Sequence, residues 1–133
     1  MLSQISIRNI AVIERAEITL GEGLNILTGE TGAGKSIIID AVNLILGERA
    51  DRSLVRTGAE NAYVEALFDV SGCPKVRRTL FEMYEDNDDE LLISREISSH
   101  GRNTCRINGR IATLTQLSKI TKDLLDIHGQ HEH

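Results

Sequence analysis

Eight consecutive residues have a composition suited to binding a polyphosphate. They read Gly29-Glu30-Thr31-Gly32-Ala33-Gly34-Lys35-Ser36 and fit the pattern G-x-x-x-x-G-K-[ST] of a phosphate-binding loop. Glycine adopts backbone angles that other residues avoid, so this segment can turn several N–H groups toward one anion. We expect Lys35 to contact the β- and γ-phosphates of a nucleotide during catalysis, and the Ser36 hydroxyl to coordinate Mg²⁺.

The residues on either side of this loop have the patterns of a strand and a helix. Residues 24–27 are mostly apolar and predict a short strand, whereas residues 37–46 contain only two polar residues, Asp40 and Asn43. The second pattern predicts a helix that is buried on nearly every side and that ends at Gly47. Its positive N-terminal end would attract the same phosphates. The alternative is a glycine-rich turn before a core helix, which leaves the complete loop pattern unexplained. The glycine spacing also differs from that of a dinucleotide-binding fold.

Length, composition and charge limit the class of protein. With 133 residues, of which 41% are apolar, the chain has the size of one domain, 1–133. No apolar run approaches 18 residues and the first residues do not resemble a signal peptide, so we expect a soluble, cytoplasmic protein with no membrane partner. Cys73 and Cys105 form no C-x-x-C pair and are expected to be buried or semi-buried thiols of a reducing compartment. The net charge of −5 disfavours a surface that coats nucleic acid in general. The basic cluster of Lys75, Arg77 and Arg78 is expected to be a solvated helix face.

Periodicity elsewhere in the chain predicts an α/β fold. Strands are expected at 2–8, 14–20, 62–70, 91–97, 104–107 and 124–128. Helices are expected from Pro74 to about Tyr84, and from a cap at Thr113 or Thr115 to about Lys122. Turns are expected at 98–103 and at Asn108-Gly109. The order predicts a P-loop NTPase with a parallel core sheet and an antiparallel β layer, as in the lobe of an ABC-type ATPase head and unlike a doubly wound nucleoside kinase.

Four segments together resemble a known family, the RecN family of bacterial DNA repair proteins. The segments are residues 7–13, 23–36, 37–50 and 126–133. This family belongs to the ABC-type ATPases related to the structural maintenance of chromosomes (SMC) proteins, whose heads combine the two ends of a chain joined by a long coiled coil. The resemblance implies that this chain is the N-terminal half of such a head, cytoplasmic and associated with the nucleoid. Its implied cofactors are ATP and Mg²⁺.

The resemblance also implies roles for residues outside the loop. Gln130 would contact Mg²⁺ and the attacking water, and Arg8 and Asn9 would approach the nucleotide from the first strand. Arg56 matches an arginine that related heads bring toward nucleotide or DNA. A basic residue often found two places after the asparagine is Ala11 here.

The same resemblance implies partners that complete the site. The sequence contains no signature motif and no strand that ends in Asp-Glu, so these parts would come from the C-terminal half of the head. A second head would join in an ATP-dependent dimer, DNA would bind the full assembly, and this chain alone would lack hydrolysis.

Other functions are less well supported by the residues. Asp126 to Gln130 also fit the D-x-x-G-Gln pattern of small GTPases, but they lie far beyond Lys35, and the guanine-selecting motif is missing. The residues His128, His131, Glu132 and His133 could suggest zinc, although no second ligand cluster exists.

A self-contained phosphotransferase acting on a small metabolite is the alternative from another enzyme class. It would need an arginine-rich lid over its acceptor site. The alternating spacing of Arg95, Arg102, Arg106 and Arg110 predicts solvent-facing positions on strands instead. A nucleotide-dependent interaction module without catalysis differs little from the ATPase interpretation.

Overall fold

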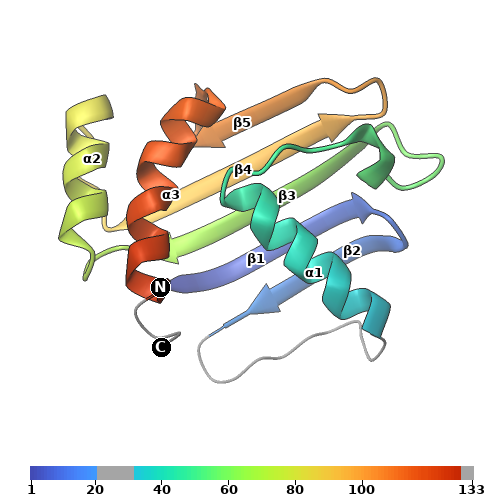
Figure 1. Cartoon of the computed structure of the whole chain (residues 1–133), viewed down its shortest axis with the longest axis horizontal. Helices are drawn as coiled ribbons and strands as arrows, with labels where there is room; N and C mark the ends of the chain where they lie inside the picture. The colour runs from blue at the N-terminus through green and yellow to red at the C-terminus, as the bar shows by residue number, and fades with distance from the viewer. Residues whose placement is uncertain (21–31, 130–133) are drawn as a thin grey trace.

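The computed structural model describes residues 1–20 and 32–129, with side chains for residues 1–20 and 36–124. The elements follow one another along the chain as shown in Figure 1. In order they are β1 (Leu2–Ile10), β2 (Ile13–Thr19), α1 (Gly32–Ile45), the 3₁₀ turn η1 (Arg52–Leu54), β3 (Asn61–Asp69), α2 (Pro74–Tyr84), β4 (Glu90–Ser98), β5 (Asn103–Ile107), β6 (Arg110–Ala112) and α3 (Leu114–Gly129).

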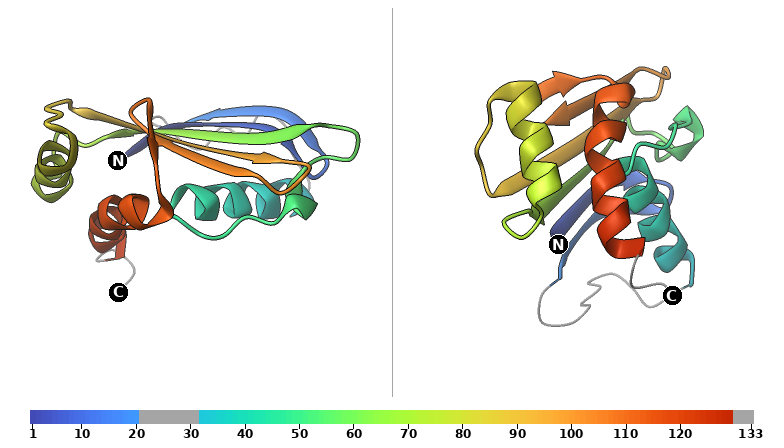
Figure 2. Two further views of the ribbon diagram at one scale, coloured as in Figure 1. Left: turned by 90° about the horizontal axis from the view of Figure 1, so that it is seen from above. Right: turned by 60° about the vertical axis from the view of Figure 1, so that its left-hand side comes forward.

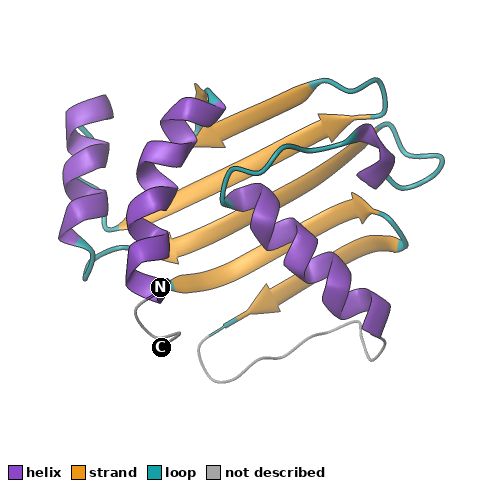
Figure 3. Ribbon diagram, in the orientation of Figure 1, coloured by secondary structure: helices purple, strands orange, loops and turns teal. Residues whose placement is uncertain are grey.

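The described strands form a six-stranded sheet in which every neighbouring pair is antiparallel. Its order is β2-β1-β3-β4-β5-β6. Helices α1 and α3 lie on the same face of this sheet, and α2 lies next to α3 beyond the ends of the strands (Figures 1 and 2). Figure 3 shows α1 crossing the strands at an angle. Because side chains alternate across a strand, every second residue of β1, β3 and β4 points toward the helices. The result is two layers, with the core between the sheet and the helices.

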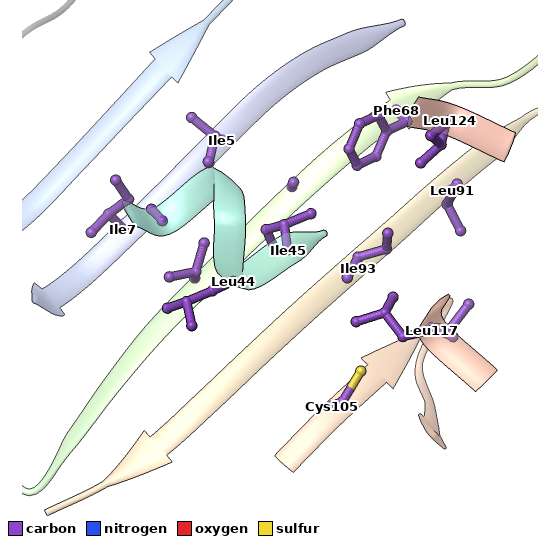
Figure 4. Packing of buried hydrophobic residues seen from close by; sticks show 14 of the residues in the cluster. Ile5, Ile7, Leu44, Ile45, Phe68, Leu91, Ile93, Cys105, Leu117 and Leu124 are labelled. Atoms are coloured by element: carbon purple, nitrogen blue, oxygen red, sulfur yellow. The ribbon is translucent and has the colours of Figure 1, made fainter. Parts of the chain in front are cut away.

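The core consists of apolar, mostly aliphatic side chains from the sheet and the helices. From the strands it includes Ile5, Ile7, Val64, Phe68, Leu91, Ile93 and Ile107, and from the helices Ala41, Leu44, Ile45, Leu117, Ile120 and Leu124. Several of these residues are seen in contact between the layers in Figure 4. Both cysteines are free and buried, as the sequence predicts. Burial of this apolar surface is the main force that holds α1 and α3 on the sheet.

Helix and turn signals in the sequence are confirmed at three places. Pro74 occupies the first turn of α2. Thr113 caps α3, because its Oγ1 accepts a hydrogen bond from the N–H of Gln116 at 3.0 Å while the Gln116 side chain accepts one from the N–H of Thr113 at 2.9 Å. Asn108 and Gly109 both have positive φ, 49° and 85°, as a two-residue hairpin between β5 and β6 requires.

The prediction of a last strand at residues 124–128 is wrong. These residues continue α3, which runs without a break to Gly129. The physical reason is that Leu117, Ile120 and Leu124 recur at helical spacing and are all buried on the sheet side. No glycine or proline separates them. The strand predicted at 24–27, which would begin a parallel core, lies outside the described residues.

A polar cluster joins the end of α2 to the turn between β5 and β6. The Asp86 carboxylate accepts hydrogen bonds from Asn108 Nδ2 at 2.9 Å and from Arg110 Nη1 at 3.3 Å. The guanidinium of Arg110 also lies over the Tyr84 ring, 4.9 Å from its centroid. The hydrogen bond from Asn108, followed by that from Arg110, lowers the pKa of Asp86.

The lowered pKa of Asp86 predicts a pH-dependent contribution to stability. A carboxylate whose folded pKa is depressed stabilises the fold above its unfolded pKa of about 4, and this stabilisation is lost as the pH falls through the folded pKa. Asp86→Asn is therefore expected to lower the free energy of unfolding at pH 7 and to differ less from the unsubstituted chain at pH 2–3. Urea denaturation across this pH range measures the difference. Glu82→Gln, an exposed carboxylate on α2, is the matched control, and a difference for Asp86→Asn that does not vary with pH would contradict the assignment.

Candidate nucleotide-binding site

The described part of the phosphate-loop sequence forms the start of α1. Gly32, Ala33, Gly34 and Lys35 make the first turn of this helix in backbone position, and Ser36 follows with an exposed side chain. Gly29, Glu30 and Thr31 lie outside the described residues. Among the described residues the first turn contains no acidic side chain, and its N–H groups and the positive end of the helix dipole favour negative charge. This end of α1 is chemically suited to an anion such as phosphate.

Helix α1 lies with one side on the sheet. Ile37, Ala41, Leu44 and Ile45 are buried, whereas Ile39 is 59% exposed and Asp40 is also exposed. The prediction that this helix is buried on nearly every side is therefore wrong for the described structure. The reason is that the buried residues of α1 pack in the core, whereas Ile39 and Asp40 lie on a side of the helix that is exposed among the described residues.

The carboxyl end of α1 is closed by a glycine, as predicted. Gly47 has a φ of +107°, its N–H donates to the carbonyl of Leu44, and the N–H of Glu48 donates to the carbonyl of Asn43. These two bonds form a Schellman motif, for which glycine is the usual residue. Thr121 of α3 also donates from its Oγ1 to the carbonyl of Leu46 at 3.2 Å. The far end of the helix is thus fixed by specific hydrogen bonds.

Arg95 of β4 also donates hydrogen bonds to carbonyls at this end of α1. The prediction that Arg95 faces solvent is wrong. Arg95 was expected to face solvent, but it is 1% exposed. In β4 the buried residues Leu91, Ile93, Arg95 and Ile97 alternate, so Arg95 shares the helix-covered face of the sheet. The alternation of Leu91, Ile93 and Ile97 is a sequence signal that could have placed Arg95 inward.

Asn9 and Arg56 meet at the turn between β1 and β2. The backbone N–H of Arg56 donates to the carbonyl of Asn9 at 2.8 Å, and Arg56 Nη1 donates to the carbonyl of Val12 at 2.9 Å. Asn9 and Ala11 have positive φ values of 56° and 52°, which are uncommon for residues other than glycine. Arg56 therefore braces a tight turn, which lies toward the same end of the sheet as the start of α1 (Figure 1).

Arg8 lies on the opposite face of the sheet from α1. Its guanidinium is 5.7 Å from the centroid of the Tyr63 ring. Both residues line a groove of about 440 Å³ together with Asn9, Glu60, Asn61, Glu65 and Glu96. Burial, followed by the hydrogen bond to Glu65, raises the pKa of Tyr63. The carboxylates of this groove would repel a polyphosphate, so contact of Arg8 or Asn9 with a nucleotide stays a prediction.

Gln130, His131, Glu132 and His133 lie outside the described residues. The carboxyl end of α3, which precedes Gln130, lies toward the start of β1, whereas α1 begins toward the other end of the sheet (Figures 1 and 2). The backbone of His128 belongs to α3. In the described residues no group of three or more His, Cys, Asp or Glu side chains could hold a metal ion. The roles predicted for Gln130 and for zinc binding stay predictions.

Comparison with known proteins gives the family. The AAA domain family matches residues 4–132, so the chain belongs to this family of ATPase domains. The resemblance to RecN is also confirmed. The chain is 44% identical to DNA repair protein RecN of Bacillus subtilis (strain 168), over 100% of this chain and 23% of that protein. It is 43% identical to DNA repair protein RecN of Xylella fastidiosa (strain Temecula1), over 100% of this chain and 24% of that protein. The chain spans about a quarter of the length of these curated relatives.

A solved structure confirms the fold class. An SMC ATPase, studied for its ATP-driven dimerization and DNA-stimulated activation, superposes with a TM-score of 0.72 and 22% identity. The match covers 93% of this chain and 79% of the other. The fold is therefore that of an SMC-type ATPase head. In the described part of the chain, no helix is long and apolar enough to cross a membrane.

The contact between Arg56 and Val12 predicts a structural effect of substitution. Arg56→Ala removes a donor from the β1–β2 turn and is expected to lower the free energy of unfolding by about 1 kcal/mol. Arg52→Ala, an exposed arginine in η1, is the matched control and should change it by less than about 0.5 kcal/mol. Chemical denaturation measures both. Equal stability of the two variants would show that Arg56 does not brace the turn.

Proposed function

We propose that this chain is the ATP-binding lobe of an SMC-like ATPase that acts in DNA double-strand-break repair and recombination. The observation that carries the proposal is the phosphate-loop sequence that runs into the start of α1, a helix end whose first turn has no acidic residue. The identity with RecN proteins over the whole chain supports the role in DNA repair. The SMC-type fold supports the division of the head into two halves.

The proposed mechanism begins with the binding of ATP. Backbone N–H groups of residues 29–36 would surround the phosphates, and Lys35 would neutralise charge on the β- and γ-phosphates. Ser36 and Gln130 would hold Mg²⁺, which supplies further charge stabilisation for phosphoryl transfer. The exposed Ser36 side chain is compatible with this role. Gln130 would also orient the attacking water.

The remaining catalytic parts are proposed to come from other segments. The general base and the signature motif would belong to the C-terminal half of the same head and to a second head, because this sequence contains neither. The complete protein would dimerise through ATP, bind DNA and reside in the cytoplasm at the nucleoid. The solved SMC relative is described as dimerising with ATP and responding to DNA, which supports this assembly.

The self-contained phosphotransferase is disfavoured because two of the four arginines considered for its lid, Arg95 and Arg110, are engaged in other contacts. Such an enzyme would need free arginines over an acceptor site. Arg95 is instead buried and bound to backbone carbonyls, and Arg110 pairs with Asp86.

The proposed mode of ATP binding predicts how substitution of Lys35 changes the affinity for ATP. The chain is expected to bind Mg·ATP weakly, and Lys35→Ala is expected to weaken binding at least tenfold, because a charge on the phosphates is lost. Isothermal titration calorimetry measures both affinities. Lys75→Ala, an exposed lysine on α2, is the matched control and should bind ATP as the unsubstituted chain does. No heat of binding for the unsubstituted chain, together with no shift in its melting temperature, would refute the proposal.

The missing general base predicts that this chain alone has no ATPase turnover. Phosphate release should appear only when the chain is mixed with a C-terminal half that supplies the signature motif and the base, and Lys35→Ala should abolish it in the mixture. A coupled phosphate assay on the chain, the C-terminal half and the mixture measures this. Robust turnover by the chain alone that is lost in Lys35→Ala would show that the site is complete without a partner.

A further inference from the structure

Arg95 forms a buried bridge between the sheet and the end of α1. Its Nη1 donates to the carbonyl of Leu44 at 2.7 Å and to the carbonyl of Glu48 at 2.9 Å. Its Nη2 donates to Asn103 Oδ1 on β5 at 3.2 Å. One guanidinium thus connects β4, β5 and two carbonyls at the carboxyl end of the helix.

Burial of the charged Arg95 side chain is energetically unfavourable. Among the described residues no carboxylate forms a salt bridge with it, and its Nε has no hydrogen-bond partner there. A buried guanidinium without a carboxylate costs desolvation energy, and an apolar side chain of similar size is often at least as stable in such a place. Stability of the core alone therefore does not explain why an arginine occupies this position. What an apolar residue could not supply is the pair of directional bonds to α1.

The hydrogen bonds from Arg95 determine the axial and rotational position of α1, which its apolar contacts do not determine alone. Ile37, Ala41 and Ile45 determine which side of the helix faces the sheet, but apolar contacts are not directional and permit small shifts along or around the helix axis. Hydrogen bonds to the carbonyls of Leu44 and Glu48 are directional and hold the helix at one axial and rotational position. The positive guanidinium also lies at the negative end of the helix dipole.

A fixed carboxyl end determines where the nucleotide end lies. Helix α1 has 14 residues and is about 20 Å long, and it is stiff over this length. Binding of phosphate by backbone N–H groups depends on their placement to within a fraction of an ångström, and a shift of about 1 Å can weaken such a site strongly. Movement of the helix at Arg95 would be transmitted to its first turn.

We propose that Arg95 is a positioning residue for nucleotide binding, which sets the place of the phosphate-binding turn by holding the opposite end of α1 against β4 and β5. The inference rests on the proposed function, that residues 29–36 bind ATP. Arg95 itself does not touch the nucleotide, because its side chain is bound to the carboxyl end of the helix.

The first test uses the unsubstituted chain. If the Arg95 end of α1 controls the nucleotide end, then by thermodynamic linkage Mg·ATP must tighten the Arg95 end. Hydrogen exchange measured by NMR should slow more at the amides of Leu46, Gly47 and Glu48 than at Leu80 in α2, and the Nε–Hε signal of Arg95 should shift. Bound ATP with no excess protection at residues 46–48 would overturn the proposal. Absence of ATP binding would instead refute the proposed function.

The second test uses Arg95→Met, which keeps the apolar volume and removes the hydrogen bonds. This variant is expected to bind Mg·ATP at least tenfold more weakly while its urea unfolding midpoint stays equal or rises. Arg95→Lys, which retains one charged donor, should recover part of the affinity. Val76→Ala, a buried substitution on α2, is the matched control, since it should lower stability and leave the affinity unchanged.

The outcomes separate positioning from a purely structural role. A folded Arg95→Met variant with the affinity of the unsubstituted chain would overturn the proposal, as would an equal loss of affinity in Val76→Ala. If Arg95→Met fails to fold, the exchange measurement on the unsubstituted chain decides alone.

Discussion

The packing of α1 across one face of the antiparallel sheet is the interaction on which the rest of this structure depends. The inward residues of β1, β3 and β4 are apolar apart from Arg95 and must be covered, and α1 and α3 supply that cover. The apolar face of α1 is what places its first turn, residues 32–35, at one end of the sheet. Without this packing the helix would be a short isolated segment with little stability of its own.

The two ends of α1 differ in their contacts with the surrounding structure. At the carboxyl end, the carbonyls of Asn43, Leu44 and Leu46 accept hydrogen bonds from the Schellman turn, Arg95 and Thr121. At the amino end, the helix has no acidic residue in its first turn. Helices leave N–H groups unpaired at one end and carbonyls at the other, so closing the carboxyl end leaves the anion-binding end as the chemically active one. The unpaired N–H groups at the amino end are what the proposed phosphate site would use.

The curated relatives of this chain are longer proteins. The chain belongs to the AAA domain family and matches about a quarter of the length of RecN proteins. The exposed Ile39 on the outer side of α1 is notable in this context, since a large apolar side chain on a core helix is normally covered. The proposed division of an ATPase site between segments is consistent with a chain that carries the phosphate-loop sequence and lacks the signature motif.

The sequence by itself determined the phosphate-loop pattern, the family and most local structure, because these depend on neighbouring residues. Gly47, Pro74, Thr113 and Asn108-Gly109 act over one turn of chain, and each predicted the end or turn that the structure contains. The prediction of a strand at residues 124–128 is wrong because this short apolar run was considered apart from the helical spacing of the residues before it. In the structure these residues continue α3. Only the tertiary structure decided which carbonyls Arg95 binds, that Arg8 lies on the face opposite α1, and that Arg56 braces the β1–β2 turn. These facts depend on which strands become neighbours and which face the helices cover, and such contacts join residues that lie about 45 to 55 positions apart in the chain.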